Sequence, residues 1–78
     1  GLAAYGLKEV SEAASYGSVE KLLVSDRLFL AERERIEPLM DEVKNKNGFV
    51  HLVNHDSEAG EQLDSLGGVA AVLRFPIQ

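Results

Sequence analysis

The chain has 78 residues and a formal net charge of −5, with 45% hydrophobic and 27% charged residues. This composition is typical of one folded globular domain and excludes a disordered tail. The sequence contains no cysteine, which excludes disulfides, thiolate metal ligands and cysteine nucleophiles and fits a reducing compartment. No apolar stretch approaches the roughly 20 residues that a membrane-spanning helix needs. Because Gly1–Tyr5 does not resemble a secretory signal and no initiator methionine is present, we expect a single domain taken from a longer, cytoplasmic protein.

Acidic and basic residues are interleaved along the sequence instead of forming separate blocks. Arg27, for example, directly follows Asp26. Three basic residues lack an acidic neighbour: Lys44, Lys46 and Arg74. Binding to a nucleic-acid backbone requires a broad positive surface, so the sequence disfavours nucleic acid as the main ligand.

The first half of the chain predicts a helix, a strand and a second helix. The first helix covers about residues 7–16, because its apolar residues recur at helical spacing and Gly17 provides a C-terminal stop. Residues 19–24 end in a continuous apolar run, which is typical of a strand covered on both faces. The second helix is predicted from the spacing of Ile36, Leu39, Met40 and Val43. We expect Pro38 in its first turn, while residues 27–37 do not define where it starts.

The second half predicts a strand, a helix and a final strand. Residues 49–54 are β-prone, and Ser57 or Asp56 can cap a third helix that Gly67-Gly68 closes. Gly60 falls inside this helix, where glycine costs about 1 kcal/mol relative to alanine, and simple tolerance is the interpretation we favour. Residues 69–73 form an apolar strand. Short apolar strands that alternate with amphipathic helices predict an α/β fold with helices on both faces of the sheet.

Few residues point to chemistry. His51 and His55 would share a face of one strand, so a common metal is one alternative. The end of the strand near Asn54 favours instead one partly buried strand histidine and one loop histidine. Carboxylates such as Glu37 and Asp41 fall on polar helix faces, where nothing predicts the desolvated cleft that acid–base catalysis needs. We therefore expect no catalytic residue, metal or cofactor, and we interpret Gly67-Gly68 as a helix stop, since a phosphate-binding loop follows a strand.

Three stretches of the sequence carry a family resemblance. They are Ala4–Asp26, with Ala4-Tyr5-Gly6 and Leu22-Leu23-Val24-Ser25-Asp26; His55-x-Ser57-x-x-Gly60-Glu61-Gln62-Leu63; and Gly67-Gly68-Val69-Ala70-Ala71-Val72-Leu73-Arg74-Phe75-Pro76. Together they cover nearly the whole chain in the expected order. The chain resembles the third, C-terminal domain of the release-factor and Pelota family. This resemblance implies a three-layer α/β/α sandwich like the fold of ribosomal proteins that bind kink-turn RNA.

Within this family the sequence is more similar to Pelota than to the termination factors, and we expect an archaeal member. The link between the first strand and the second helix is short. Termination factors often resemble one another in having a mini-domain inserted at this position. The ending Ala70–Pro76 is also similar to that of Pelota. The pair Glu58-Ala59 departs from the Pelota pattern, because it lengthens the spacing between serine and glycine. The alternative of an archaeal peptide chain release factor therefore stays open.

The resemblance implies a protein-docking role in ribosome rescue, not catalysis. Pelota resembles a transfer-RNA-shaped adaptor that enters stalled ribosomes with an elongation-factor-1-alpha-like GTPase. The C-terminal domain would dock this GTPase and later the ribosome-recycling ATP-binding-cassette ATPase that splits the subunits. Family domains of this kind also resemble one another in beginning with a further helix, which we expect to precede Gly1.

The candidate partner-binding residues lie at the end of the chain: Arg74, Phe75, Pro76 and Ile77. Aromatic and arginine side chains dominate the energetics of interfaces, which is why we select them. The alternative for Phe75 is a structural position beneath the first helix.

A kink-turn RNA-binding domain is the second alternative function. The first helix of the RNA-binding ribosomal proteins begins with Gly-x-Asn-Glu-x-x-Lys, and the matching stretch here is Gly6-Leu7-Lys8-Glu9-Val10-Ser11-Glu12. The glycine and the first glutamate match, but Lys8 replaces the asparagine and Glu12 replaces the lysine. A carboxylate in place of a cation reverses the sign of a phosphate contact, so we expect no direct grip on RNA.

Overall fold

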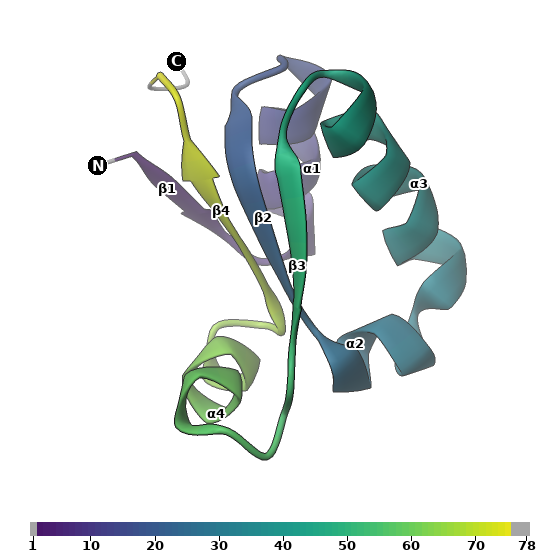
Figure 1. The fold of residues 1–78 in the computed structure, drawn as a ribbon, viewed down its shortest axis with the longest axis vertical. Helices are drawn as coiled ribbons and strands as arrows, with labels where there is room; N and C mark the ends of the chain where they lie inside the picture. Colours follow the sequence, from purple (N-terminus) through teal and green to yellow (C-terminus); the bar gives the residue numbers. More distant parts are fainter. Residues whose placement is uncertain (1, 76–78) are drawn as a thin grey trace.

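The computed structural model describes residues 2–75, which form four strands and four helices (Figure 1). In chain order these are β1 Ala3–Tyr5, α1 Leu7–Ser15, β2 Val19–Ser25, α2 Asp26–Ala31, α3 Arg33–Asn45, β3 Phe49–Val53, α4 Glu58–Ser65 and β4 Val69–Leu73. The predicted α/β class is confirmed, and α1, β2, β3, α4 and β4 lie within one or two residues of their predicted bounds. Of the other three elements, β1 and α2 are absent from the prediction, and α3 was predicted without a defined start. Within residues 2–75, no helix combines the length and apolar character needed to cross a membrane.

The four strands form one mixed sheet in the order β1-β4-β2-β3. Strand β4 is antiparallel to both β1 and β2, while β2 and β3 run parallel. The three residues of β1 are too few to show an alternating pattern, and β1 exists as a strand because Ala3–Tyr5 pair with residues 70–72 of β4. Strand β4, the last strand in residues 2–75, is therefore an inner strand of the sheet.

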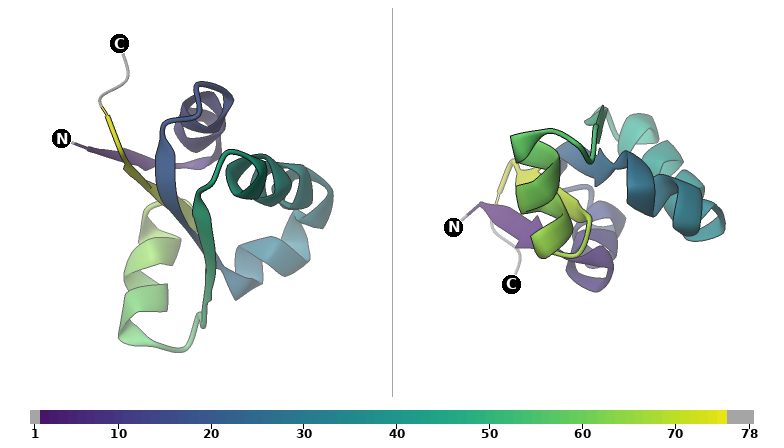
Figure 2. Two further views of the ribbon diagram at one scale, coloured as in Figure 1. Left: turned by 45° about the horizontal axis from the view of Figure 1, so that its top comes forward. Right: turned by 90° about the horizontal axis from the view of Figure 1, so that it is seen from below.

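Helices α1 and α3 pack against each other and cover one face of the sheet (Figure 2). The cross-strand partners Ala4, Ala71, Leu22 and Val50 point to this face. All but Val50 are at most 4% exposed, and Val50 packs against them at the edge. The helices contribute apolar residues at helical spacing: Val10, Ala13, Ala14, Ile36, Leu39 and Val43. This single apolar cluster is the main core.

The opposite face of the sheet is covered only at one end by described residues. Helix α4 packs against β2 and β4 there and buries Ala70 and Leu63, which lie outside the main core cluster. Beyond α4, the side chains of Tyr5, Val72 and Phe49 remain exposed. The prediction of helices on both faces is confirmed, and within residues 2–75 the second helical layer is α4 alone.

The segment that the sequence left undefined contains a short helix and an early start of α3. The buried Ser25 hydroxyl accepts a hydrogen bond from the Arg27 N–H and caps α2. Helix α3 begins at Arg33, so the expectation of Pro38 in the first turn is wrong. Pro38 follows five helical residues and removes one backbone hydrogen bond, which the burial of Ile36, Leu39 and Val43 offsets.

Candidate protein-docking surface

Arg74 is exposed at the end of β4, but its side chain is held in place. The guanidinium Nη2 donates to the carbonyl oxygens of Val19 at 2.9 Å and Lys46 at 3.2 Å. The Arg74 backbone N–H donates to the carbonyl of Ser18 at 2.8 Å. Arg74 therefore ties the ends of α3 and β4 to the start of β2, and it presents a positive charge in a fixed position.

Phe75, the second predicted contact residue, is 45% exposed. This exposure is greater than a position packed beneath α1 would leave, so the structure favours the interpretation of Phe75 as an accessible aromatic side chain. The predictions for Pro76 and Ile77 lie outside the described residues. The part of the predicted surface that the structure describes is thus a fixed arginine followed by an exposed phenylalanine.

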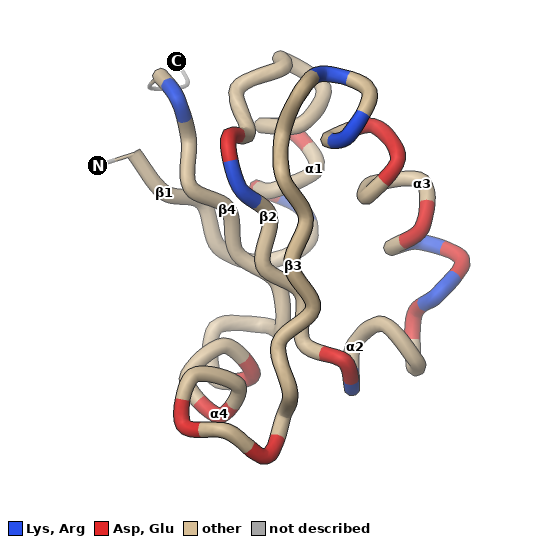
Figure 3. Tube along the Cα trace, in the orientation of Figure 1, with Lys and Arg blue, Asp and Glu red and all other residues tan. Residues whose placement is uncertain are grey.

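Two of the basic residues that lack acidic neighbours in the sequence lie together, because the Arg74 guanidinium donates to the Lys46 carbonyl oxygen. Figure 3 shows basic positions at the end of the domain opposite α4 and also on α2 and α3. Lys46 contributes little free charge to this end, because its ammonium donates to the carbonyls of Ala14 and Ser15 and to the Glu42 carboxylate. Arg74 likewise donates to backbone carbonyls. The structure therefore brings Lys46 and Arg74 together and fixes both side chains by hydrogen bonds to the backbone.

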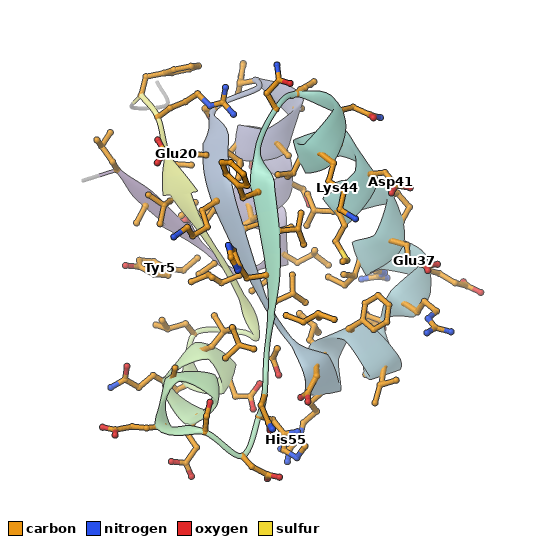
Figure 4. All side chains as sticks on the ribbon, in the orientation of Figure 1. Tyr5, Glu20, Glu37, Asp41, Lys44 and His55 are labelled. Atoms are coloured by element: carbon orange, nitrogen blue, oxygen red, sulfur yellow. The ribbon has the colours of Figure 1, made fainter. Side chains whose placement is uncertain are left out.

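His55 joins the end of β3 to the start of α2 (Figure 4). Its Nδ1 lies 2.8 Å from Oδ1 of Asp26, and its backbone N–H donates to the same oxygen at 3.1 Å. Nε2 lies 3.1 Å from Oδ1 of Asp56. The hydrogen bond from the His55 side chain is the largest effect on the pKa of Asp26 and lowers it. Partial burial, the next largest effect, opposes this shift, and the bond from the His55 backbone N–H lowers the pKa further. These contacts fix the β3–α4 connection and involve two carboxylates from different segments.

His51 and His55 do not share a face of β3, since the strand ends at Val53. His55 lies in the turn, as predicted, but His51 is exposed, so the expectation of a partly buried strand histidine is wrong. Over residues 2–75, no group of three or more histidine, cysteine, aspartate or glutamate side chains is arranged to hold a metal ion. The two-histidine metal alternative therefore lacks the geometry it needs.

The sequence analysis missed two surface features. The first is the open sheet face, where Ala3, Val72, Lys21 and Phe49 form a row across all four strands. The second is a groove of about 410 Å³ between α2 and the turn that joins α4 to β4. Both depend on strand order and on the position of α2. The alternation of Phe49, His51 and Val53 is the only local signal for the first.

The family model for eRF1 domain 3 matches residues 1–77. The chain belongs to the eRF1 domain 3 family. A Pelota homologue from Thermococcus onnurineus is 56% identical over the whole chain, which corresponds to 22% of that relative's length. The chain thus spans about a fifth of the curated relatives it matches. The resemblance to the Pelota branch, based on sequence motifs, is confirmed.

Solved structures of family members agree with this assignment. Archaeal Pelota, in a model of ribosome-bound Pelota and ABCE1, is 54% identical with a TM-score of 0.93, covering 100% of this chain and 22% of that one. Dom34 from S. cerevisiae, a translation termination-like factor that interacts with Hbs1, is 38% identical with a TM-score of 0.90, covering 96% and 22%. The archaeal translation termination factor aRF1 is less similar, at 32% identity and a TM-score of 0.75 over 96% and 21%. Similarity within the family is therefore greater to Pelota than to this termination factor.

Proposed function

We propose that this chain is the protein-docking domain of a cytoplasmic ribosome-rescue factor and contributes no catalytic group. The observation that carries the proposal is its similarity, over its whole length, to Pelota bound to the ribosome with ABCE1. By the family resemblance, the domain docks an elongation-factor-1-alpha-like GTPase and later a ribosome-recycling ATP-binding-cassette ATPase. Its mechanism is positional, because a rigid domain that holds a partner fixes the other domains of the factor on the ribosome.

The surface proposed to contact the GTPase is the C-terminal end of the chain. Arg74 is held by two backbone carbonyls, so little side-chain entropy is lost when a partner binds it. Phe75 is exposed beside it and can enter an apolar pocket of the partner. Pro76 and Ile77 extend this surface in the sequence.

The direct experiment is a calorimetric titration of the chain with the elongation-factor-1-alpha-like GTPase. Phe75→Ala should weaken binding about tenfold or more, as expected for an aromatic anchor. Tyr16→Ala is the matched control, because Tyr16 is also an exposed aromatic residue, at the end of α1. Equal affinity of both variants and the unmodified chain would exclude Phe75 from the contact, and no binding by any of them would contradict the docking function.

The archaeal release-factor alternative is weaker than the Pelota assignment. The TM-score of 0.93 to ribosome-bound Pelota compares with 0.75 to the archaeal termination factor over nearly the same residues. A rescue assay separates the two functions. We expect the factor that contains this domain to act on ribosomes stalled without a stop codon, and strict dependence on a stop codon would favour the alternative.

We also propose that residues 1–78 form one domain whose open sheet face is covered by a helix that precedes Gly1. The exposed apolar side chains of Tyr5, Val72 and Phe49 support this proposal. In an upstream-extended form, Phe49→Ser should lower the free energy of unfolding, since it removes a buried ring. In the chain 1–78 the same change should have little effect, because Phe49 is 65% exposed. Equal effects in both forms would contradict the proposal.

A further inference from the structure

Strand β3 forms one edge of the sheet, and its outer side has no partner strand among residues 2–75. Phe49–Val53 pair only with β2 (Figure 1). Apart from this pairing, no backbone–backbone hydrogen bond in the described part of the chain involves these residues. The strand also contains no proline, lysine, arginine or acidic residue, the residue types with which natural edge strands prevent further pairing. The β3 edge is therefore open to another strand.

The opposite edge, β1, is protected against such pairing. It has three residues, and the Tyr5 N–H donates to the Glu9 carboxylate at 3.4 Å. This carboxylate occupies a backbone donor that another strand would need, and its negative charge disfavours the approach of carbonyl oxygens. Of the two edges described by residues 2–75, β3 is the one that combines length with free backbone groups.

The outward backbone groups of β3 belong to Val50 and Leu52. The Ser25 N–H donates to the Gly68 carbonyl next to β4, so the alternate residue Val24 directs its own N–H and C=O toward β3. Leu52 lies opposite Val24 in the parallel pair. A residue in this position points its N–H and C=O to the other side, away from β2, and the same holds for Val50, two residues earlier.

We propose that the β3 edge pairs with the β3 edge of a second copy of this chain, antiparallel and about a twofold axis at His51. In this register Val50 of each copy lies opposite Leu52 of the other. Each of these two pairs exchanges both N–H···O=C bonds, so every outward group of the two residues is satisfied in both copies. The inference does not rest on the proposed docking of a GTPase.

The apolar side chains of this edge fit the same register. Leu52 is 53% exposed, because α3 packs over β2 and β3 without covering its side chain. In the antiparallel pair it would pack against the half-buried Val50 of the second copy, as cross-strand apolar pairs do. The contact uses the strand edge, so the open sheet face stays available to the helix proposed to precede Gly1.

The charges that flank β3 favour a second copy in the antiparallel orientation. The exposed Lys44 precedes the strand, and Asp56, whose side chain is 81% exposed, follows it. Figure 3 shows basic positions near the start of β3 and an acidic position in the turn after it. Antiparallel pairing places the start of each strand beside the end of the other, so opposite charges meet at both ends of the contact.

The predicted dimer is weak. Pairing of two five-residue strands buries less surface than the roughly 1,200 Å² of the smallest stable complexes. We therefore expect a Kd on the order of 100 µM, which sedimentation equilibrium of the chain measures directly. A chain that stays monomeric up to about 1 mM would overturn the proposal.

The first variant places a charge on the pairing edge. Leu52→Lys should raise the Kd of the dimer about tenfold or more, since a lysine on an edge strand opposes pairing. Leu30→Lys is the matched control, because it adds the same charge at a leucine of α2 that is 75% exposed. If Leu52→Lys dimerises as tightly as the unmodified chain, or if Leu30→Lys weakens the dimer equally, the contact does not lie at β3.

The second pair of variants tests the register. The chain contains no cysteine, so His51→Cys introduces a single thiol. At the twofold axis the two Cα atoms would be about 4.5 Å apart, within the range of a disulfide. In the same register the Cα atoms of two copies of Phe49→Cys would be about 13 Å apart. Mild oxidation should therefore cross-link His51→Cys and leave Phe49→Cys monomeric, whereas equal cross-linking of the two would contradict this register.

An extended segment of an unrelated protein is the alternative occupant of the edge. We would titrate the isotopically labelled chain with a synthetic peptide of residues 47–54 and with a scrambled peptide of the same composition. The native peptide should shift the amide signals of Val50 and Leu52, and the scrambled peptide should shift them at least several-fold less. Equal shifts with both peptides would show an edge that accepts any strand and would overturn the assignment to a second copy.

Discussion

The ammonium nitrogen of Lys46 lies 3.1 Å from the carbonyl oxygen of Ala14, so a residue at the end of α3 caps the end of α1. A second bond reaches Ser15 at 3.0 Å. Both carbonyls lie at the negative end of the α1 dipole, where Ala14 also accepts from the Gly17 N–H at 3.0 Å. Lys46 therefore connects two helices that are far apart in the sequence.

Replacement of Lys46 by methionine should therefore destabilise the fold. Charge-assisted hydrogen bonds to a helix end, here partly exposed, contribute about 1–2 kcal/mol. Urea denaturation of Lys46→Met should show a loss of this size. Lys44→Met, at an exposed position two residues earlier, is the control and should change the free energy of unfolding by less than about 0.5 kcal/mol. Similar losses for both would contradict the cap.

Gly60→Ala should destabilise the protein, although helix propensity alone predicts the opposite sign. An added Cβ atom would clash with the carbonyl oxygen of Asn54 and lie 2.8 Å from Cα of His55. Because these are backbone atoms, the overpacking should cost about 1–3 kcal/mol. The change would be measured by thermal or urea unfolding, with Gln62→Ala as an exposed control in α4. A stabilised Gly60→Ala variant would show that α4 can move away from the β3–α4 turn.

The contact between Asp26 and His55 predicts a pH dependence. The pKa of Asp26 is lowered in the folded protein, chiefly by the hydrogen bond from the His55 side chain. A lowered folded-state pKa adds stability above the unfolded value of about 3.9, and this stability is lost as the pH falls through the folded pKa. NMR titration should show the Asp26 carboxyl titrating at higher pH in His55→Gln than in the unmodified protein.

The matching control for this titration is His51→Gln, since His51 is an exposed histidine on β3. The unfolding free energies of His55→Gln and the unmodified protein should differ at pH 5 and converge at the acid end. An unchanged Asp26 titration in His55→Gln would contradict the assigned cause.

Arg74→Lys should separate stability from binding at the C-terminal surface. Lysine keeps the charge, but a single ammonium does not reproduce the planar guanidinium that bonds Val19 and Lys46. We expect a loss of about 1 kcal/mol in urea unfolding, whereas Phe75→Ala should leave stability nearly unchanged. If Arg74→Lys is as stable as the unmodified chain, the two carbonyl contacts contribute nothing measurable.

Elements with a strong local pattern were predictable from the sequence. The apolar spacing in α1, the Ser57 cap with its bond to the Gly60 N–H, and the apolar run of β4 are properties of adjacent residues. Family motifs added the three-layer arrangement and the Pelota assignment. The start of α3 was predicted wrongly from Pro38. The free energy gained by burying the apolar residues around Pro38 exceeds the preference of proline for the first turn of a helix.

The features that could not be predicted depend on tertiary structure. Strand β1 is defined by its partner and not by its own three residues. The groove depends on how α2 meets the Gly67-Gly68 turn, which lies about 40 residues away in the sequence. Arg74 could be selected as a candidate contact residue because arginine is common in interfaces. Its hydrogen bonds to Val19 and Lys46 could not be predicted, because no local sequence pattern shows that these positions are close in space.

The position of β4 has a consequence for how the domain is made. Among the strands of residues 2–75 it is synthesised after the other three, yet it lies between β1 and β2 and holds both in the sheet. A nascent chain that ends before Val69 can form its helices and the parallel β2–β3 pair. In such a chain β1 has no neighbouring strand, and the edge of β2 opposite β3 is unpaired. This sheet is therefore completed during translation only when β4 leaves the ribosome, and chains truncated before β4 expose a sheet edge prone to aggregation.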